Sequence, residues 1–276
     1  MVTKEMMLAA LRELGVGEGD AILTHSSFKS LGGCENGADT VISAMREAVG
    51  ESGTVIFPTL CQKDWDHVYE NWHMDAPSDV GYLTNYFRTL EGAKRSNQAT
   101  HSVAAMGALA DELTATHGES GLRYGIFGDT PFSADSPWQK MYEHDVKVIF
   151  LGCSIKSCTF RHLAEYIVME EYLEKAKKSP NYEDLLAEVW HYTKYSKHGV
   201  WPHIKSLYLE EILKAEGKHR TATCGDATLA LVSSRDFVDL SIRLMKEHCA
   251  EALNEYPPLW TVAETLDWMT RVEALG

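Results

Sequence analysis

The chain has 276 residues, of which 45% are hydrophobic and 24% charged, and this is the composition of an ordinary globular protein of one compact unit or two closely packed lobes. It carries 26 Lys and Arg residues against 40 Asp and Glu residues, for a formal net charge of -14. This balance argues against nucleic acid as the main partner, because phosphate binding needs a basic face, and it fits attraction of a cationic small molecule.

The sequence also indicates where the protein works. Its first 15 residues form an amphipathic pattern rather than a signal peptide, and no apolar run approaches the roughly 20 residues that span a bilayer. The cysteines are scattered and include no C-x-x-C pair, so we expect reduced thiols rather than disulfides or structural zinc. We therefore predict a cytoplasmic protein with no membrane partner. The cysteines are Cys34, Cys61, Cys153, Cys158, Cys224 and Cys249.

The chain begins with alternating helices and strands. Residues 3–14 predict a helix, and residues 21–23 predict a strand that ends in the polar run 24–27. A glycine-containing loop and a helix at 37–49 follow. This arrangement can bind an anion through free backbone N–H groups, but it matches neither the Walker nor the dinucleotide pattern, and an ordinary βα loop explains it equally well.

The next part contains a long loop between regular elements. Residues 53–58 predict a strand that Pro58 ends, and residues 61–79 predict a long ordered loop of the kind that covers a site. Residues 78–90 predict a helix capped by Ser78. After this helix the sequence predicts a turn at 92–96, a strand at 99–107, helices at 108–114 and 138–144, and turns at 125–131 and 135–138.

Residues 146–166 are the most informative stretch. An apolar run with β-branched residues, closed by Gly152, predicts a buried strand, and Ser157 or Thr159 can cap the helix that follows. His162 and Glu165 are three residues apart and share a face of that helix. A histidine at the open end of a buried strand, one turn before a carboxylate, is typical of a general base and its orienting acid, whereas the pair alone would more often be a solvated surface pair.

The composition changes after residue 166. The aromatic stretch 182–195 predicts strand and loop, and residues 221–234 predict one strand. Helices are predicted at 170–178, at 204–214, at 236–248 with Asp236 as the cap, and at 259–272. The alternation of strands and helices predicts an α/β layered fold.

Several motifs occur together in the order of one family. They are HSS at 25–27, LGG at 31–33, PSDVGYLTNYFR at 77–88, GAKRS at 92–96, THSVAAMG at 100–107, FG at 127–128, SPW at 136–138 and TFRHLAE at 159–165. In this order they resemble the aminoglycoside 3-N-acetyltransferases, the large antibiotic acetyltransferase family rather than the general N-acetyltransferase fold. The match covers most of residues 5–166 and is thin beyond.

The resemblance implies a fold and an activity. The fold would be a three-layer α/β/α arrangement around a central mixed β-sheet. We expect a single domain over residues 1–276, with the coenzyme-binding part mainly in 1–166 and a less defined part in 167–276. Such a protein would transfer an acetyl group from acetyl-coenzyme A, without a metal, to the 3-amino group of an aminoglycoside. A homodimer remains open.

The resemblance also assigns residues. His162 would be the base and Glu165 its partner. The coenzyme contacts would be Ser26, Ser27, Leu31, Ser96, His101, Ser102 and Val103. Candidates for the coenzyme phosphates, chosen by charge, are Arg95, Lys94 and Lys29, with solvent favoured for Lys94. Candidates to meet a cationic acceptor are Asp64, Asp66, Asp75, Asp79 and Glu170, most of which we expect to be solvated. We expect His25 to be a structural histidine, whereas His101 could shape the coenzyme pocket or take part in the chemistry.

Two departures from the family pattern concern the acceptor. The family usually has His-Pro where this chain has Gln98-Ala99, which we expect to loosen a loop near the coenzyme. The family often has Glu where this chain has Asn85, which removes a carboxylate that could meet a cationic sugar.

In the expected chemistry, neutral His162 takes a proton from the acceptor amine as it attacks the thioester, and Glu165 stabilises the imidazolium. Backbone N–H groups or the Ser102 hydroxyl near Val103 would stabilise the oxyanion. Transfer would be direct, in a ternary complex.

Other interpretations stay open. One is a covalent nucleophile, with Ser26, Cys153 or Cys158 activated by His162, although no G-x-S-x-G elbow is present. A second is a metal site formed by Cys158 and His162. The others are an N-acetyltransferase of the same fold acting on a different amine, and a protein that binds ligand without turnover.

Overall fold

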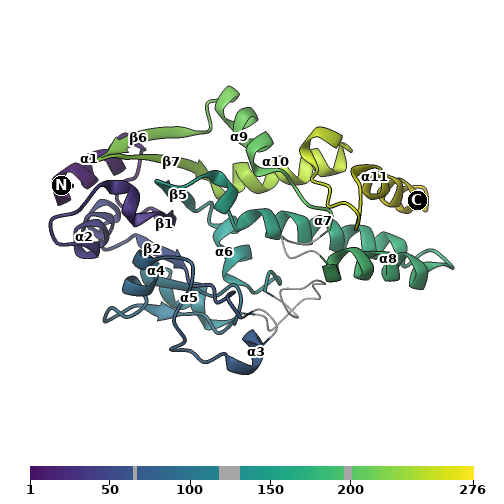
Figure 1. Ribbon diagram of the computed structural model, residues 1–276, viewed down its shortest axis with the longest axis horizontal. Coiled ribbons are helices and arrows are strands. Elements are labelled where there is room, and N and C mark those ends of the chain that lie inside the picture. Colours follow the sequence, from purple (N-terminus) through teal and green to yellow (C-terminus); the bar gives the residue numbers. More distant parts are fainter. Residues whose placement is uncertain (65–66, 118–130, 196–200) are drawn as a thin grey trace.

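The computed structural model describes residues 1–64, 67–117, 131–195 and 201–276 (Figure 1). Its sheet has seven strands in the order β3-β4-β2-β1-β5-β7-β6. The strands are β1 Ala21–Ser26, β2 Thr54–Pro58, β3 Lys94–Arg95, β4 Val103–Gly107, β5 Lys147–Leu151, β6 Arg220–Cys224 and β7 Ala227–Ser233.

The sheet is mixed, with a parallel centre and antiparallel flanks. β1 pairs in parallel with β2 on one side and with β5 on the other. β4 and β3 add on the β2 side, and β7 and β6 add on the β5 side, all by antiparallel pairing. The polar carboxyl end of β1 is therefore bracketed by the carboxyl ends of two parallel neighbours.

Helices cover both faces of this sheet (Figure 1). The α-helices are α1 Lys4–Glu13, α2 Ala38–Val49, α3 Val68–Asn71, α4 Tyr82–Phe87, α5 Ala110–Ala115, α6 Pro137–Glu143, α7 Phe160–Ala176, α8 Tyr182–Tyr195, α9 Ser206–Ala215, α10 Ser234–Lys246 and α11 Val262–Glu273. Three 3-10 turns are η1 Phe28–Leu31, η2 Ile155–Ser157 and η3 Ala250–Ala252. None of these described helices is long and apolar enough to cross a membrane.

The two-residue period of the strands separates two cores. Along β1, Ile22 packs with α1, α2 and α4 on one face, whereas Leu23 packs with α6, α7 and α10 on the other. The predicted three-layer α/β/α arrangement around a mixed sheet is thus confirmed. The second core continues without a break into α11, since Trp268 and Val272 belong to it. In Figure 1, α8 and α11 lie at the end of the molecule opposite α1 and α2.

Two predictions for the second half were wrong. Residues 182–195 form helix α8 rather than strand and loop, because Leu185 and Val189 fall on one face and are buried there. Residues 221–234 form the hairpin β6–β7 rather than one strand, because Gly225 adopts a positive φ of 57° and turns the chain between Cys224 and Ala227.

Three smaller predictions also differ from the structure. Helix α4 begins at Tyr82 rather than at 78, and Ser78 instead donates its hydroxyl to the carbonyl of Leu60, 2.8 Å away. Ser233, not Asp236, caps α10. The expected turn at 92–96 contains the edge strand β3. The FG motif at 127–128 and the turn predicted at 125–130 lie outside the described residues.

Gly107 gives a direct test of this packing. A Cβ placed there would lie 2.1 Å from the carbonyl oxygen of Gly53, and the backbone φ is +128°. We expect Gly107→Ala to lower the free energy of unfolding by about 3 to 5 kcal/mol through clash and backbone strain, as measured by urea denaturation.

Gly217→Ala is the matched control, since its φ is +70° but nothing lies within 4 Å of the added Cβ. Its cost should be about 1 kcal/mol, from backbone strain alone. Equal costs for the two variants would contradict the close approach of β4 to residue 53.

Candidate active site

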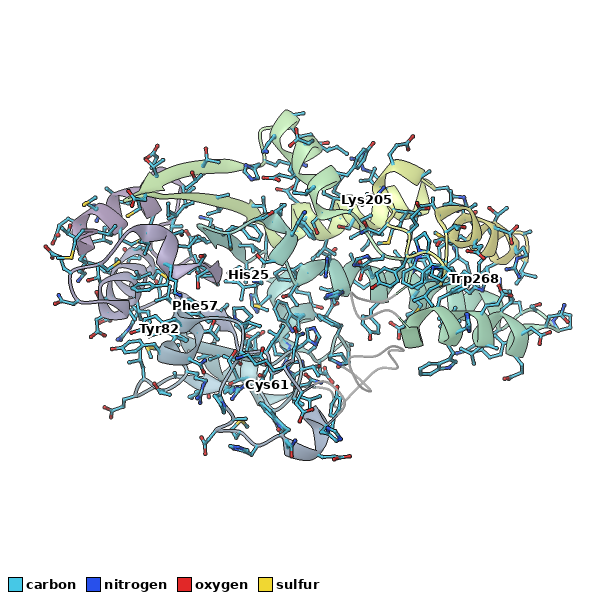
Figure 2. All side chains as sticks on the ribbon, viewed as in Figure 1. His25, Phe57, Cys61, Tyr82, Lys205 and Trp268 are labelled. Carbon is cyan, nitrogen blue, oxygen red and sulfur yellow. The ribbon has the colours of Figure 1, made fainter. Side chains whose placement is uncertain are left out.

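The candidate site lies at the carboxyl ends of the parallel strands. The chain leaves β1 toward β2 on one side and later returns as β5 on the other, so the connections diverge at the end of β1. In open α/β sheets this divergence leaves a crevice at that edge. A cavity of about 280 Å³ lies there, lined by residues that include Ser26, Pro58 and His162. Figure 2 shows His25 near the middle of the molecule, between Phe57 and Lys205 along the long axis.

His162 and Glu165 form a buried pair at the start of α7. His162 Nδ1 lies 2.9 Å from Glu165 Oε2, and the two side chains are 8% and 0% exposed. Glu165 Oε1 accepts a second hydrogen bond from the backbone N–H of Ile204, at 2.9 Å. A carboxylate held at both oxygens fixes the imidazole and keeps its proton on Nδ1. Nε2 is therefore the nitrogen that carries the lone pair.

The surroundings of His162 favour its neutral form. Burial lowers the pKa of His162 well below its ordinary value, and the positive charge of Arg161 lowers the pKa further. Arg161 Nε lies 3.3 Å from His162 Nε2, to which it donates. The ring of His203 stacks at a centroid distance of 6.5 Å. A buried imidazole that is neutral near pH 7 is suited to accept a proton.

His101 lies beside His162 on a tightly held loop. The two rings meet edge to face at a centroid distance of 5.8 Å. Gln98 Oε1 accepts from the backbone N–H of His101 at 2.5 Å, and Gln98 Nε2 donates to the hydroxyl of Tyr69 at 3.2 Å. Trp138 Nε1 donates to the carbonyl of His101 at 2.9 Å. The expectation that Gln98-Ala99 loosens this loop is wrong, because the glutamine amide ties it on both sides.

Of the residues predicted at the end of β1 and in the loop after it, one lines the cavity. Ser26 does so directly. Ser27 donates its backbone N–H to the carbonyl of Leu151 at 2.8 Å, which joins the ends of β1 and β5. The side chain of Leu31 is buried in the core of the opposite face, with α1 and α2.

Ser96, Ser102 and Val103 are not among the described residues that line the cavity. Ser96 Oγ accepts from the backbone N–H of Val103 at 3.0 Å and lies 2.8 Å from His117 Nδ1. Ser102 Oγ donates to the carbonyl of Thr59 at 3.0 Å. All three predicted residues are fully buried. Their polar atoms bond to the protein rather than line the cavity.

Arg95 holds the long loop that follows β2. Its guanidinium donates to the carbonyls of Ala76 at 2.5 Å, Thr59 at 2.6 Å and Met74 at 2.9 Å, and it lies 4.5 Å from the ring centroid of Trp72. Burial lowers the pKa of Arg95. In this structure its hydrogen-bonding capacity is directed to backbone carbonyls, so the coenzyme role assigned to it stays a prediction.

His25 lines the cavity from the end of β1. The ring is buried, stacks on Phe150 at a centroid distance of 5.6 Å, and its Nε2 has no hydrogen-bond partner among the described residues. Burial lowers the pKa of His25 to about 4, so the ring is neutral. This is a packed core histidine, as expected, and it also has an unbonded ring nitrogen beside the site.

The cysteines near the cavity are poorly suited to act as nucleophiles. Burial raises the pKa of Cys158 to about 12 and also raises the pKa of Cys153. Both thiols therefore remain protonated near pH 7, whereas a thiolate would be needed for attack. Within the described part of the chain, no group of three or more His, Cys, Asp or Glu side chains is placed to hold a metal ion.

The sequence reasoning missed a second cavity next to the first. It measures about 460 Å³, and Lys156 and Arg161 line both cavities. Lys205 lines it from the residue before α9, 49 positions from Lys156 in the chain. One available signal was the repeated tripeptide Ile-Lys-Ser at 155–157 and 204–206, which in both places begins a helical turn.

Comparison with known proteins gives a consistent result. A family model described as aminoglycoside 3-N-acetyltransferase matches residues 23–246. Aminoglycoside N(3)-acetyltransferase VII of Streptomyces paromomycinus is 27% identical over 278 residues, covering 89% of this chain and 92% of that protein. Aminoglycoside N(3)-acetyltransferase III of a Salmonella species is 27% identical over 276 residues, covering 90% of this chain and 93% of that protein.

Solved structures share the fold. The apoenzyme of aminoglycoside acetyltransferase AAC(3)-IVa has a TM-score of 0.69 at 23% identity and covers 98% of both chains. A binary complex of AAC-IIIb with CoASH has a TM-score of 0.67 at 22% identity, covering 92% of this chain and 99% of that one.

The role of Arg95 can be tested by a conservative change. We expect Arg95→Lys to lower the free energy of unfolding by about 2 to 4 kcal/mol, because the single nitrogen of an ammonium cannot reach the three carbonyls that two guanidinium nitrogens contact. Thermal and urea denaturation would measure this loss.

The neighbouring variant Lys94→Ala, which removes an exposed pair with Asp111, serves as control and should cost less than about 1 kcal/mol. An Arg95→Lys protein of unchanged stability with a raised KM for acetyl-coenzyme A would instead make Arg95 a phosphate ligand.

Proposed function

The chain belongs to the aminoglycoside 3-N-acetyltransferase family and is thus an acyltransferase, and on this premise we propose that His162 is the general base of acetyl transfer from acetyl-coenzyme A to an aminoglycoside amine. The observation that carries this proposal is the buried bond from His162 Nδ1 to Glu165, which leaves Nε2 as the nitrogen that accepts a proton. The amine would take the place of Arg161, whose Nε donates to Nε2 in this structure. The transfer is direct, with both substrates bound together.

The transfer moves one acetyl group to the amine and one proton from the amine to the departing sulfur. The amine nitrogen attacks the thioester carbonyl carbon, and its proton goes to Nε2 of His162. The carbon–sulfur bond then breaks, the thiolate leaves, and the imidazolium returns the proton to that sulfur. Glu165 stabilises the imidazolium through Nδ1–H, and the buried position of this carboxylate strengthens the interaction.

The donors for the oxyanion are better sought at α7 than at the loop named from the sequence. Ser102 Oγ and the N–H of Val103 both have partners within the protein. Thr159 lines the cavity at the amino end of the 17-residue helix α7, and its side chain makes no cap bond. We therefore assign the oxyanion to this helix end, where the Thr159 hydroxyl and the helix dipole favour negative charge.

One observation favours a second acceptor class. Among the described residues that line the two cavities, Glu255 is the one carboxylate. Asp79, a candidate for the acceptor, instead accepts from the backbone N–H of Gln62 and Lys63 at 2.5 and 2.7 Å. Asp66 lies outside the described residues. An amine with fewer charges than an aminoglycoside is therefore the alternative, and a panel of both kinds of amine, assayed by thiol release, separates them.

Replacing His162 tests the base. We expect His162→Ala to lower kcat by about 10³-fold, because general base catalysis is lost, while the Kd for coenzyme A stays within about threefold. Thiol release and calorimetry would measure the two quantities.

His144→Ala is the matched control, since His144 pairs with Glu112 on the surface of α6. Retained turnover in the His162 variant would reject the assignment, and loss of coenzyme binding alone would make His162 a binding residue.

The protonation state of His162 gives a second test. Because its pKa lies well below the ordinary value of about 6.5, His162 should stay neutral at pH 6.5, with the proton on Nδ1. Activity that depends on the neutral ring is then fully present above pH 6.5 and is lost as the pH falls through the lowered pKa. Nitrogen-15 spectra of the histidine rings, assigned with His162→Ala, would measure the titration. A midpoint at or above pH 6.5, or a proton on Nε2, would contradict the geometry.

A further inference from the structure

A second histidine lies beside the carboxylate that orients His162. His203 precedes helix α9, and its Nε2 lies 3.8 Å from Glu165 Oε1, with 8% of the His203 side chain exposed. His162 Nδ1 lies 2.9 Å from the other carboxylate oxygen. The two imidazole rings are stacked, 16° from parallel, with centroids 6.5 Å apart. Each oxygen of Glu165 therefore has an imidazole nitrogen as a neighbour.

Asn254 fixes which nitrogen of His203 carries the proton. Its amide nitrogen donates to the carbonyl of Ile204 at 3.0 Å, and this bond sets the orientation of the amide, because a carbonyl oxygen can only accept. The same amide nitrogen lies 3.1 Å from His203 Nδ1 and, as a donor, requires a lone pair there. In the neutral ring the proton is then on Nε2, the nitrogen next to Glu165.

The backbone holds these groups in place. The N–H of Asn254 donates to the carbonyl of His203 at 2.8 Å, and Ile204 forms an isolated antiparallel bridge with Leu253. Ile204 and Leu253 are both fully buried. Since the N–H of Ile204 also donates to Glu165 Oε1 at 2.9 Å, one backbone segment brings two N–H groups to the same carboxylate oxygen.

The tautomer of His203 matters for the charge of Glu165. An N–H dipole next to a carboxylate stabilises the anion, and at 3.8 Å it does so through electrostatics rather than through a hydrogen bond. The opposite tautomer would place a nitrogen lone pair beside the carboxylate and repel it. Burial strengthens both effects, because the Glu165 side chain is 0% exposed and the local dielectric is low. The position of one proton on His203 thus determines how firmly Glu165 is held.

We propose that Asn254 and His203 are positioning residues for the reaction. Asn254 holds His203 in the tautomer with the proton on Nε2, and this N–H orients the Glu165 carboxylate toward His162 Nδ1. Both residues act through Glu165 and not on the substrates. The catalytic part of this proposal rests on the proposed function of His162, whereas the tautomer of His203 does not.

The tautomer can be measured without any need for activity. Nitrogen-15 spectra of the histidine rings at pH 7, assigned with His203→Gln, should show the proton of His203 on Nε2 in the unmodified protein. We expect Asn254→Asp to remove this state, because a carboxylate only accepts and therefore places a proton on Nδ1. Asn36→Asp adds the same charge in the exposed loop before α2 and should leave the His203 signals unchanged.

Two results of this measurement would overturn the proposal. One is a proton on Nδ1 of His203 in the unmodified protein. The other is an unchanged His203 tautomer in the Asn254→Asp protein.

Turnover tests the positioning role. We expect Asn254→Asp to lower kcat by at least about tenfold, because the orientation of Glu165 and hence of His162 is lost, with the KM for both substrates within about threefold. Asn36→Asp should keep kcat within about twofold. An unchanged kcat in an Asn254→Asp protein whose His203 tautomer has changed would reject the positioning role.

A second pair of variants tests the N–H of His203 itself. His203→Gln keeps an N–H that can reach Glu165, whereas His203→Leu removes the donor. We expect the glutamine variant to retain kcat within about threefold and the leucine variant to lose at least about tenfold. Thermal unfolding checks that both variants fold, and equal losses of kcat in the two folded proteins would contradict the proposal.

The outcomes also separate this proposal from the proposed function. A His162→Ala protein that keeps its turnover rejects His162 as the base, while the spectra of His203 still decide its tautomer. An inactive His162→Ala protein beside a fully active Asn254→Asp protein rejects the positioning role alone.

Discussion

The hydrogen bond between His162 and Glu165 is the constraint on which the site depends. Burial of a carboxylate costs free energy unless both of its oxygens form hydrogen bonds. Glu165 bonds to His162 through one oxygen and to the backbone N–H of Ile204, a residue that follows α8 in the sequence, through the other. The geometry of the site in residues 1–166 therefore requires residues 167–276 to be folded against it. This requirement agrees with a core that runs from β1 to α11 without interruption.

The electrostatics of the site follow from burial and from the cations that line the two cavities. Burial lowers the pKa of His25, His101 and His162, so the rings around the first cavity are neutral near pH 7. Positive charge lies instead on Lys156 and Arg161, which line both cavities, and on Lys205, which lines the second.

The sequence predicted the elements whose residues are neighbours in the chain. β5, α7 and the His162–Glu165 spacing follow from an apolar run, a capped turn and a helical period. Helix α8 was not predicted because its aromatic residues favoured a strand, although its apolar residues have helical spacing. The β6–β7 hairpin was also missed, although Gly225-Asp226 is a two-residue turn sequence that could have indicated it. The second cavity was not predicted, because Lys156 and Lys205 are brought to one cavity by the packing of α9 on η2 and lie far apart in the chain.

The two departures from the family pattern show how this loop region is held. Gln98 accepts from the backbone of His101, and Asn85 Oδ1 accepts from the backbone N–H of Ser78 at 2.8 Å while its amide donates to the Ser78 carbonyl. A glutamate at 85 could accept the first bond but could not donate the second. At position 85 the amide therefore replaces the charge of the family glutamate with two hydrogen bonds to Ser78. With few carboxylates in the described walls, attraction of a cationic acceptor depends on the net charge of the whole chain rather than on one ion pair.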